Sequence, residues 1–264
     1  LVIGAGISGI LAAKNAAKNN FKTLLVDEKN ELGGSTIFEN TDFNKIDNKT
    51  PSEWLKKEIE ELKSIKNLEI KTRTSVAAYH QYNYLLAREN LTDHLETKDK
   101  TNKIRQRLLK IRAKKVILAT GALERPLIFN NNDRPGIMLS SAVKKYSEFY
   151  GVACGNKNVF FTNNDSAYES ALSLYNKGIT VAAIIDIRDQ SKSKIVKKVE
   201  EAGIKIYWSH SIVDTAGYKR LNKVTIMKLS NDGTSVTGSK VSISCDCLGV
   251  AGGWTPAVHL YTQS

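Results

Sequence analysis

The sequence has few cysteines, with three among 264 residues. Cys154 stands alone, whereas Cys245 and Cys247 form a C-x-C within the alternating stretch VSISCDCLGV. This number and spacing predict neither a disulfide framework nor a C-x-x-C redox pair. No further cysteine or histidine pair stands beside them at metal-ligand spacing, so we expect no metal site. We interpret the three as structural cysteines of a protein from a reducing compartment, the cytoplasm.

Long apolar runs are also missing from the sequence. No segment approaches the roughly 20 consecutive apolar residues of a membrane-spanning helix, and we expect no membrane partner. No charged-then-apolar leader precedes the first expected strand, which already contains Leu1. The final HLYTQS carries no stop signal, so we interpret the chain as a piece of a longer protein.

The charge is strongly positive, at +12, but it lacks the pattern of a nucleic-acid groove. The lysines are mostly interleaved with acids, as in KKEIEELKSIK and KSKIVKKVEEAGIK, and no stretch alternates basic with aromatic residues. We therefore expect no nucleic acid as a partner. An acidic protein surface is the better interpretation of this charge.

The N-terminal LVIGAGISGI carries a G-x-G-x-x-G between an apolar strand and an alanine-rich helix. Gly4 serves the tight turn, Gly6 the close approach of a phosphate, and Gly9 the packing of helix against strand. The start of a helix offers backbone N–H groups and a dipole that favours an anion. The motif therefore predicts a site for the pyrophosphate of a dinucleotide.

An acidic turn follows the second strand, about twenty residues beyond the glycines, where a carboxylate binds ribose hydroxyls. Asp27 and Glu28 stand there in LLVDEKN, and they favour NAD or FAD over NADP. Lys29 is either a nucleotide contact or a solvated surface charge. The next glycine pair ends at Gly34 and predicts a second close-approach loop, with Ser35 as a hydrogen-bond donor.

A second βαβ pattern runs from 158 to 186, but its loop reads TNNDSA where glycines are expected. Side chains there crowd a pyrophosphate, and Asp165 repels one, although Asp186 keeps the position of the ribose-binding acid. We interpret this loop as an eroded nucleotide site that is kept for structure. Between the two patterns, VILATGALERP returns the chain to the first site, with Thr120 and Gly121 beside the cofactor.

These patterns predict an α/β fold: a Rossmann-like FAD/NAD(P)-binding domain with a second, inserted Rossmann-like domain and a β-meander. The expected bounds are 1–150 plus 240–264 for the first domain and 151–239 for the second. The meander is expected near 68–118, with a polar tip between Asn90 and Lys103. NLEIKTRTSVAAYHQ and GIKIYWSHSIVD are each expected to form one strand. Val76 stands where the third strand of the doubly wound sheet is expected to bring its backbone to an adenine.

Three stretches, ATGALERPLIFNNNDRPGIMLSSAVKKYSEFYGV, VFFTNNDSAYESAL and CDCLGVAGGWTPAVHLYTQS, resemble the α subunit of heterotetrameric sarcosine oxidase over the whole chain. The resemblance implies an oxidoreductase complex that demethylates sarcosine to glycine and yields hydrogen peroxide and a folate-bound one-carbon unit. It implies FAD in the β subunit, FMN at the α–β interface, and γ and δ subunits as further partners. It also implies a folate-binding domain and an upstream ferredoxin-like domain outside this chain.

The resemblance further implies a non-covalent NAD in the first site and no catalytic residue in this chain. The residues carried over by motif as its contacts are Gly4, Gly6, Ser8, Gly9, Asp27, Glu28, Lys29, Gly34, Ser35, Val76, Thr120, Gly121, Trp254, His259 and Tyr261. Two alternatives stay open, because the same glycines and acid serve FAD equally well. One is a related amine or opine dehydrogenase subunit, or a stand-alone FAD-dependent NAD(P)H oxidoreductase; the other is a cofactor-free interaction module.

Overall fold

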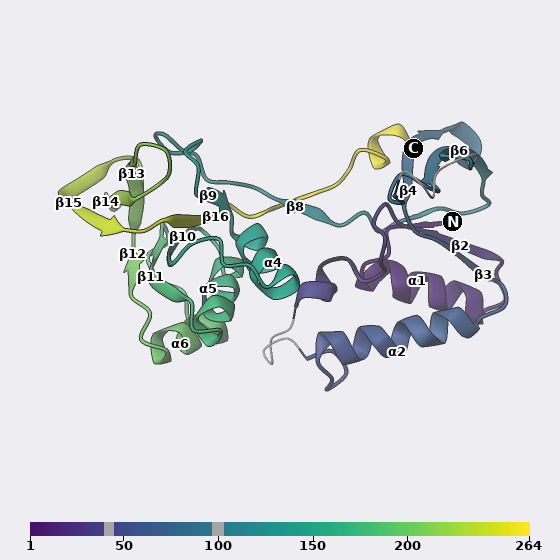
Figure 1. The fold of residues 1–264 in the computed structure, drawn as a ribbon, viewed down its shortest axis with the longest axis horizontal. Coiled ribbons are helices and arrows are strands. Elements are labelled where there is room, and N and C mark those ends of the chain that lie inside the picture. Colours follow the sequence, from purple (N-terminus) through teal and green to yellow (C-terminus); the bar gives the residue numbers. More distant parts are fainter. Residues whose placement is uncertain (40–44, 97–102) are drawn as a thin grey trace. The chain divides into compact units, whose positions relative to one another are not determined.

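The computed structural model describes residues 1–39, 45–96 and 103–264, so part of the polar tip expected after Asn90 lies outside the described residues. The chain divides into two compact units. The first contains Leu1–Ala122 and Pro256–Ser264, and the second contains Leu123–Thr255. The chain passes between them twice, within the paired strands β8 (Ala122–Glu124) and β17 (Trp254–Pro256) (Figure 1).

The first unit is built on a parallel sheet with the strand order β3-β2-β1-β7. Val2 pairs with both Leu25 and Ile117, and Thr23 pairs with Leu68. The strands are β1 (Val2–Ile3), β2 (Thr23–Val26), β3 (Leu68–Lys71) and β7 (Ile117–Leu118). Because all four run parallel, their carboxyl ends meet at one edge, where ligands of such sheets bind.

Two helices lie side by side in this unit, α1 (Ile7–Lys18) and α2 (Pro51–Ser64) (Figure 1). The start of α2 is fixed by a capping box between Thr50 and Glu53, with Pro51 at the first helical position. The buried Trp54 belongs to a core cluster that also contains Ile10 of α1. A 3-10 helix, η1 (Gly34–Phe38), precedes α2.

Ion pairs join the two helices. Lys14 Nζ lies 2.6 Å from Glu58 Oε2 and 2.8 Å from Glu61 Oε2. The hydrogen bonds from Lys14 and Lys18 lower the pKa of Glu61 to about 2. These contacts supplement the apolar packing between α1 and α2.

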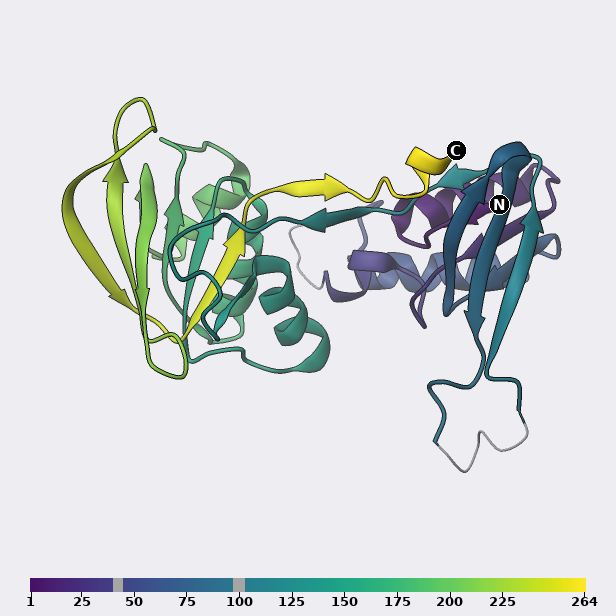
Figure 2. The ribbon, with the colours of Figure 1, turned by 90° about the horizontal axis from the view of Figure 1, so that it is seen from above.

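The meander is a three-stranded antiparallel sheet that Figure 2 shows as adjacent twisted strands. Its strands are β4 (Thr74–His80), β5 (Tyr84–Asn90) and β6 (Gln106–Arg112), and the 3-10 helix η2 (Gln81–Asn83) forms the first turn. The sequence predicted one strand across 67–81, which was wrong, because that stretch holds both β3 and β4. It also predicted a meander near 68–118, and the observed meander begins at Thr74 and ends at Arg112. Arg73 takes a left-handed backbone with φ 49°, so β3 ends before it and joins the parallel sheet instead.

The C-terminal segment returns to the first unit and ends in the 3-10 helix η3 (Tyr261–Gln263). Leu260 is buried in a cluster with Ile3, Val26 and Leu85. The side-chain oxygen of Gln263 accepts a hydrogen bond of 2.9 Å from the backbone N–H of Tyr79 in β4. These contacts attach the chain's last residues to its first strand and to the meander.

The second unit has its own parallel sheet, with the order β12-β11-β10-β16-β9, and a separate antiparallel sheet, β13-β14-β15. The parallel strands are β9 (Ile137–Leu139), β10 (Lys157–Thr162), β11 (Thr180–Asp186), β12 (Ile206–Trp208) and β16 (Cys247–Ala251). The helices are α4 (Ser140–Tyr150), α5 (Ser166–Asn176) and α6 (Lys194–Glu201). The antiparallel strands are β13 (His210–Ala216), β14 (Lys223–Leu229) and β15 (Val236–Ser244).

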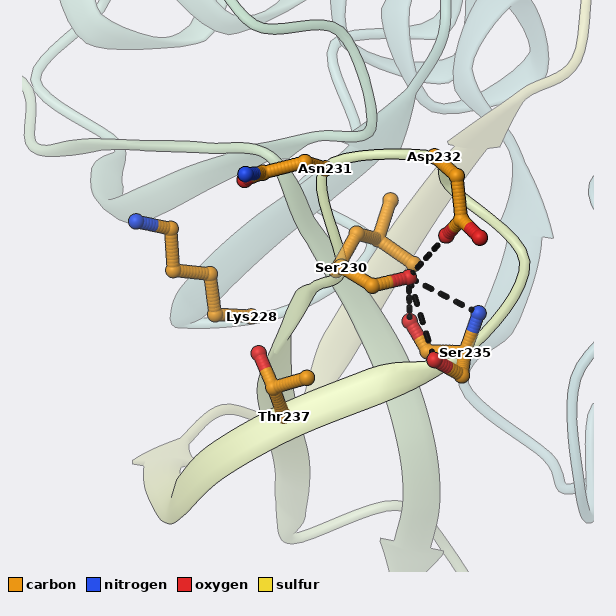
Figure 3. A pocket seen from close by; sticks show the side chains of 7 residues that line it. Lys228, Ser230, Asn231, Asp232, Ser235 and Thr237 are labelled. Carbon is orange, nitrogen blue, oxygen red and sulfur yellow. Dashed lines mark hydrogen bonds between the residues drawn. The ribbon is translucent and has the colours of Figure 1, made fainter.

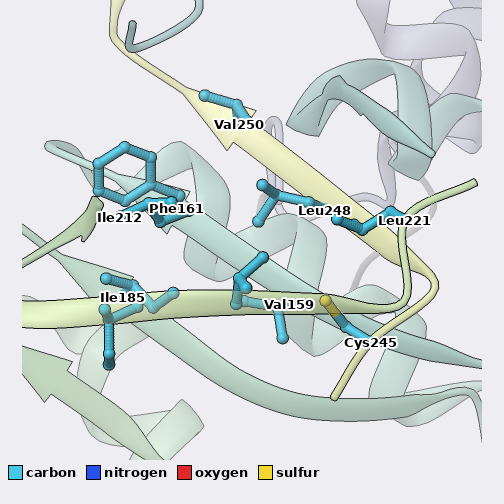
Figure 4. Close-up of a cluster of buried hydrophobic side chains, with 10 residues drawn as sticks. Val159, Phe161, Ile185, Ile212, Leu221, Cys245, Leu248 and Val250 are labelled. Atoms are coloured by element: carbon cyan, nitrogen blue, oxygen red, sulfur yellow. The ribbon is translucent and has the colours of Figure 1, made fainter. Parts of the chain in front are cut away.

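The core of this unit joins its two sheets (Figure 4). Val159, Phe161 and Leu248 from the parallel sheet pack with Ile212 and Leu221 from the antiparallel sheet and its connection. The prediction of one strand across 203–214 was wrong, because Ser209 takes φ 53° and the chain leaves the parallel sheet there. That break allows β13 to cover the apolar face of the parallel sheet.

The observed units differ from the predicted bounds of 151–239 for the second domain. The strands β9 and β16 lie outside those bounds, yet β16 pairs with β10 along Asn158–Thr162 and with β9 along Ile137–Leu139. Both strands complete the second sheet, so the second unit takes residues 123–150 and 240–255 as well. The pairing between distant segments decides this division, and no local pattern in the sequence marks it.

Candidate nucleotide-binding site

The first glycine motif forms a turn in which two glycines have no room for a side chain. Gly4 has φ 97°, and a Cβ there would lie 2.8 Å from the carbonyl carbon of Ala119. A Cβ on Gly9 would lie 2.8 Å from the carbonyl carbon of Gly4 and 3.3 Å from Ala119 Cβ. The backbones of β1, α1 and the segment after β7 therefore approach each other closely, as the motif predicts.

Gly6 differs from these two glycines, because a Cβ built on it meets no atom within 4 Å. It is the N-cap of α1. Among the residues that the structure describes, no side chain caps this helix start, and the first turn contains no acidic residue. Ser8 is exposed in that first turn. The helix start thus presents free backbone donors beside an open space, an arrangement that suits an anion.

The second glycine pair packs onto the first motif. Gly33 N–H donates to the carbonyl of Ala5 at 2.7 Å, and a Cβ on Gly34 would lie 3.0 Å from Gly6 Cα. Both glycines have positive φ angles, 123° and 60°. Ser35 follows in η1 and is exposed. Two turns without side chains therefore flank the same stretch of backbone.

The acidic turn lies against the glycine turn. Asp27 Oδ2 accepts a 2.6 Å hydrogen bond from the N–H of Ala5, and Oδ1 accepts one of 2.8 Å from the N–H of Lys29. A carboxylate has about four acceptor positions, so these bonds orient Asp27 and leave capacity for ribose hydroxyls. Glu28 and Lys29 are exposed beside it.

Val76 lies in β4 of the antiparallel meander, whereas the sequence placed it where a third strand of the doubly wound sheet was expected. It is half-buried against the cluster of Ile3, Val26 and Leu85, and its backbone pairs with Ala87. The third strand of the sheet is β3, which ends before Val76. The connection between β3 and β4, which the sequence analysis did not single out, lies nearer the acid.

Thr120 and Gly121 follow β7 and bind the returning C-terminal segment. Thr120 Oγ1 donates to the carbonyl of Ala257 at 2.7 Å, and the N–H of Ala257 donates to the carbonyl of Gly121 at 2.9 Å. Both predicted residues are exposed, as are His259 and Tyr261 further along. The sequence did not predict Ala257, whose role depends on its backbone and leaves no side-chain signal.

Trp254 falls in the second unit, while the other fourteen predicted contacts fall in the first. Its side chain is exposed, and Nε1 donates to Ser166 Oγ at the start of α5 across 3.4 Å. The structure thus gives Trp254 a contact with the second loop of its own unit.

That second loop is filled by its own side chains. Asn164 Oδ1 accepts hydrogen bonds from the N–H and the hydroxyl of Ser166, at 3.0 and 2.5 Å, so it occupies the donors at the start of α5. Asn164 Nδ2 donates to the carbonyl of Ala251 at 3.2 Å, and Thr162 Oγ1 donates to the carbonyl of Asn164 at 2.8 Å. These bonds use the groups that a phosphate would otherwise engage.

The acid of this second unit is also occupied. Asp186 is fully buried, and Arg188 Nη2 lies 2.7 Å from its Oδ2 and 2.8 Å from Asp165 Oδ1. The hydroxyl of Tyr168 donates to Asp186 Oδ2 at 2.8 Å. The hydrogen bonds that Arg188 donates to Asp186 raise the pKa of Arg188. Burial is the largest cause that raises the pKa of Tyr168, and the negative charge of Asp186 is the next. This network has an arginine and a tyrosine where a ribose would bind.

The NNDRPG stretch forms hydrogen bonds with β13, an edge strand of the antiparallel sheet, and with the residue Gly217 just after it. Asn131 Nδ2 donates to Asp214 Oδ1 at 3.1 Å, and the guanidinium of Arg134 donates to the carbonyl of Gly217. Asp214 lies at an irregularity in the pairing of β13 with β14. In the structure this part of the motif anchors a strand.

One cavity lies beside the second glycine pair, and another lies in the second unit. The first, of about 520 Å³, is lined by Leu32, Ile37, Leu55, Ile59 and Ile70, with Asn30, Glu31, Ser52, Lys63 and Thr72 as polar neighbours. The other, of about 510 Å³, lies at the β14–β15 turn (Figure 3). There Ser230 donates to Asp232 at 2.5 Å, and bonds from Ser230 and Thr234 lower the pKa of Asp232 to about 2. These polar groups satisfy one another within the turn.

Cysteine and metal chemistry find little support in the residues that the structure describes. Cys154, Cys245 and Cys247 are free, and burial raises the pKa of both Cys245 and Cys247 to about 12. A reactive cysteine needs a lowered pKa. The described residues contain no group of three or more His, Cys, Asp or Glu that could hold a metal ion. Across the same residues, every helix is too short or too polar to span a bilayer.

Comparison with known proteins places this geometry in a family. The model of the pyridine nucleotide-disulphide oxidoreductase family matches residues 1–264. The chain belongs to this family. It is an oxidoreductase family of nucleotide-binding flavoproteins, and our prediction of the Rossmann-like fold class is confirmed.

Relatives confirm the predicted resemblance as well. The sarcosine oxidase α subunits of Corynebacterium sp. (strain P-1) and Rhizobium meliloti (strain 1021) are 37% and 34% identical over 100% and 98% of this chain. The chain spans 27% and 25% of their lengths, about a quarter. The crystal structure of T. acidophilum thioredoxin reductase matches with a TM-score of 0.73 at 18% identity, over 99% of this chain and 79% of that one. That likeness concerns the fold.

Proposed function

We propose that the first unit binds NAD as part of a sarcosine oxidase α-type subunit. The observation that carries this proposal is the open space at Gly6, set between the crowded backbones of Gly4, Gly9 and Gly34. A folded protein has no packing reason to keep this position bare, whereas a pyrophosphate needs it bare. The capless start of α1 supports an anion at the same place.

The remaining contacts follow the edge of the parallel sheet. We propose that Asp27 binds the adenosine ribose, with Glu28 and Lys29 beside it, because its carboxylate is oriented by the glycine turn itself. Ser8, Ser35, Val76, Thr120, Gly121, His259 and Tyr261 are proposed as further contacts within the first unit. A nicotinamide, when bound, exchanges hydride; the proposed roles of these residues are to bind and orient it.

We propose that the second unit binds no dinucleotide. Asn164 and Arg188 fill the places where a phosphate and a ribose are held in a functional βαβ unit. A stand-alone flavoprotein that uses NAD(P)H needs both sites, so this filling favours the subunit over that alternative. FAD in the first site remains the alternative occupant, because the same groups recognise either adenosine.

The activity of the whole complex follows from the relatives by extension. We propose that it oxidatively demethylates sarcosine to glycine, with hydrogen peroxide and a folate-bound one-carbon unit as products. In this proposal FMN lies at the interface with a β subunit, and FAD lies in that partner. The γ and δ subunits complete the assembly, and folate binds a domain outside this chain. We assign no catalytic residue to the chain.

The first experiment is to purify the full-length subunit, denature it, and identify the released nucleotide by absorbance and mass. NAD without flavin supports the proposal and places the chemistry in a partner. FAD released from the isolated subunit favours the stand-alone flavoprotein. A protein that neither carries nor binds either nucleotide contradicts the proposal and leaves an interaction module.

A variant tests the position that carries the proposal. Gly6→Val fills the open space with an isopropyl group, and we expect it to abolish nucleotide retention while the circular dichroism spectrum stays unchanged. Leu11→Val is the matched control, because it places a valine on the exposed side of the same helix. Retention of the nucleotide by Gly6→Val would remove the glycine motif from the site.

A further inference from the structure

Arg73 occupies an unusual place at the carboxyl edge of the first sheet. It follows β3, as Asp27 follows β2 and Gly4 follows β1, and these three strands are neighbours in the sheet. The backbone N–H of Arg73 donates to the carbonyl of Lys29 at 2.7 Å, and the N–H of Thr74 donates to the carbonyl of Asp27 at 2.8 Å. Two backbone hydrogen bonds therefore fasten the Arg73 turn to the acidic turn.

The backbone of Arg73 is strained. Its φ of 49° lies in the left-handed region, which a side chain with a Cβ rarely adopts and which glycine or asparagine would take more easily. The carbonyl of Arg73 also accepts a hydrogen bond of 2.9 Å from the N–H of Asn90. The turn is thus fixed on both sides, and an arginine is retained where folding alone would favour another residue.

The guanidinium has no structural use within the described residues. The side chain is partly buried, yet among 1–39, 45–96 and 103–264 no hydrogen bond, ion pair or ring contact engages it. Asp27, on the neighbouring strand end, instead uses its carboxylate to bind the N–H groups of Ala5 and Lys29. The guanidinium of Arg73 is partly buried and makes no ion pair with the neighbouring carboxylate of Asp27, so it is free to contact a ligand.

We propose that Arg73 binds the adenine of the nucleotide by stacking its guanidinium on the face of the base. The planar guanidinium suits the face of an aromatic ring better than a lysine ammonium does. A 2′-phosphate is the other ligand for an arginine at this edge, but the carboxylate of Asp27 repels that charge. This inference rests on the proposed function, and it extends that function by naming the group that recognises the base.

The test measures the affinity of the full-length protein, stripped of nucleotide, for ADP by titration calorimetry. ADP is the part that NAD and FAD share, so the result does not depend on which one is bound. We expect Arg73→Gln to weaken ADP binding roughly tenfold, and Arg73→Lys to recover only part of that loss. Arg88→Gln is the matched control, since Arg88 is exposed on β5 of the meander that follows Arg73; we expect it to bind like the wild type.

A second readout separates binding from structure. Arg73→Gly relieves the left-handed backbone, so we expect it to raise the unfolding temperature while it weakens ADP binding. A residue kept only for structure would move both quantities in the same direction. Unchanged ADP affinity in Arg73→Gln and Arg73→Gly overturns the inference, as does a loss confined to 2′-phosphorylated ADP. If the wild-type protein binds neither ADP, NAD nor FAD, the proposed function fails together with this inference.

Discussion

The two glycines at the start of α1 make opposite predictions for one and the same substitution. Gly9→Ala places a Cβ 2.8 Å from the carbonyl carbon of Gly4, and ordinary contact begins near 3.4 Å, so backbone atoms must separate by at least 3.4 − 2.8 = 0.6 Å. The carbonyl oxygen of Gly4 lies nearer still, so the cost is at the upper end of the about 1–3 kcal/mol that overpacking brings, and the better helix propensity of alanine offsets about 1 kcal/mol of it. We expect a net loss of about 2 kcal/mol in the free energy of unfolding.

Gly6→Ala adds the same methyl group to open space. The φ of Gly6 is −71°, which alanine adopts without strain, so only the difference between the two residues as N-caps remains, about 0.5 kcal/mol. We therefore expect Gly6→Ala to unfold nearly as the wild type does and to bind nucleotide poorly. Gly9→Ala is expected to be the less stable protein of the two.

Urea unfolding followed by tryptophan fluorescence measures this difference within the first unit. Trp54 is 2% exposed and packs against α1, whereas Trp208 and Trp254 belong to the second unit. Replacing the latter two by phenylalanine in all proteins leaves Trp54 as the reporter of the first unit. Equal midpoints for Gly9→Ala and the wild type, or a larger loss for Gly6→Ala, would refute the reasoning.

Two further predictions concern buried charges of the second unit. Arg188→Leu removes the partner of the fully buried Asp186, so we expect the free energy of unfolding of this unit to fall by about 3 kcal/mol. Trp208 fluorescence measures this change, and a loss below about 1 kcal/mol would contradict the prediction. Glu124 is buried, and burial raises its carboxyl pKa although Ser141 N–H donates to it at 2.8 Å. The folded state then holds this proton more tightly than the unfolded state, so stability falls as pH rises from the unfolded value through the folded one. We expect Glu124→Gln to gain stability over the wild type across that interval and to keep the gain at neutral pH; equal midpoints from about pH 4 to pH 8 would contradict it.

The glycine turns were predictable because each carries a local signal with one steric meaning. Gly4, Gly6 and Gly9 stand at fixed spacing between an apolar strand and a helix, and the structure has crowded backbone at Gly4 and Gly9 and open space at Gly6. Asp27 was predictable for the same reason, since it follows the second strand directly. These positions depend on neighbours in the chain.

Other features depend on contacts that no local pattern records. Arg73 and Ser209 have left-handed backbones that end strands, although neither is a residue type that readily takes a positive φ angle. The pairing of β16 with β10 and with β9 joins segments about a hundred residues apart and decides where the second unit begins. Asp186 matched the position of a ribose-binding acid, and only the structure reveals that Arg188 already binds it.

The interrupted first unit has a consequence for the order in which the protein folds. Its last segment, Pro256–Ser264, buries Leu260 against Ile3, but synthesis delivers that segment only after all of 123–255. Closing a flexible loop of that length costs on the order of 4 kcal/mol in chain entropy, and a folded insert removes most of that cost. The second unit is therefore expected to fold first. The first unit is expected to finish folding last, although most of it is synthesised earlier.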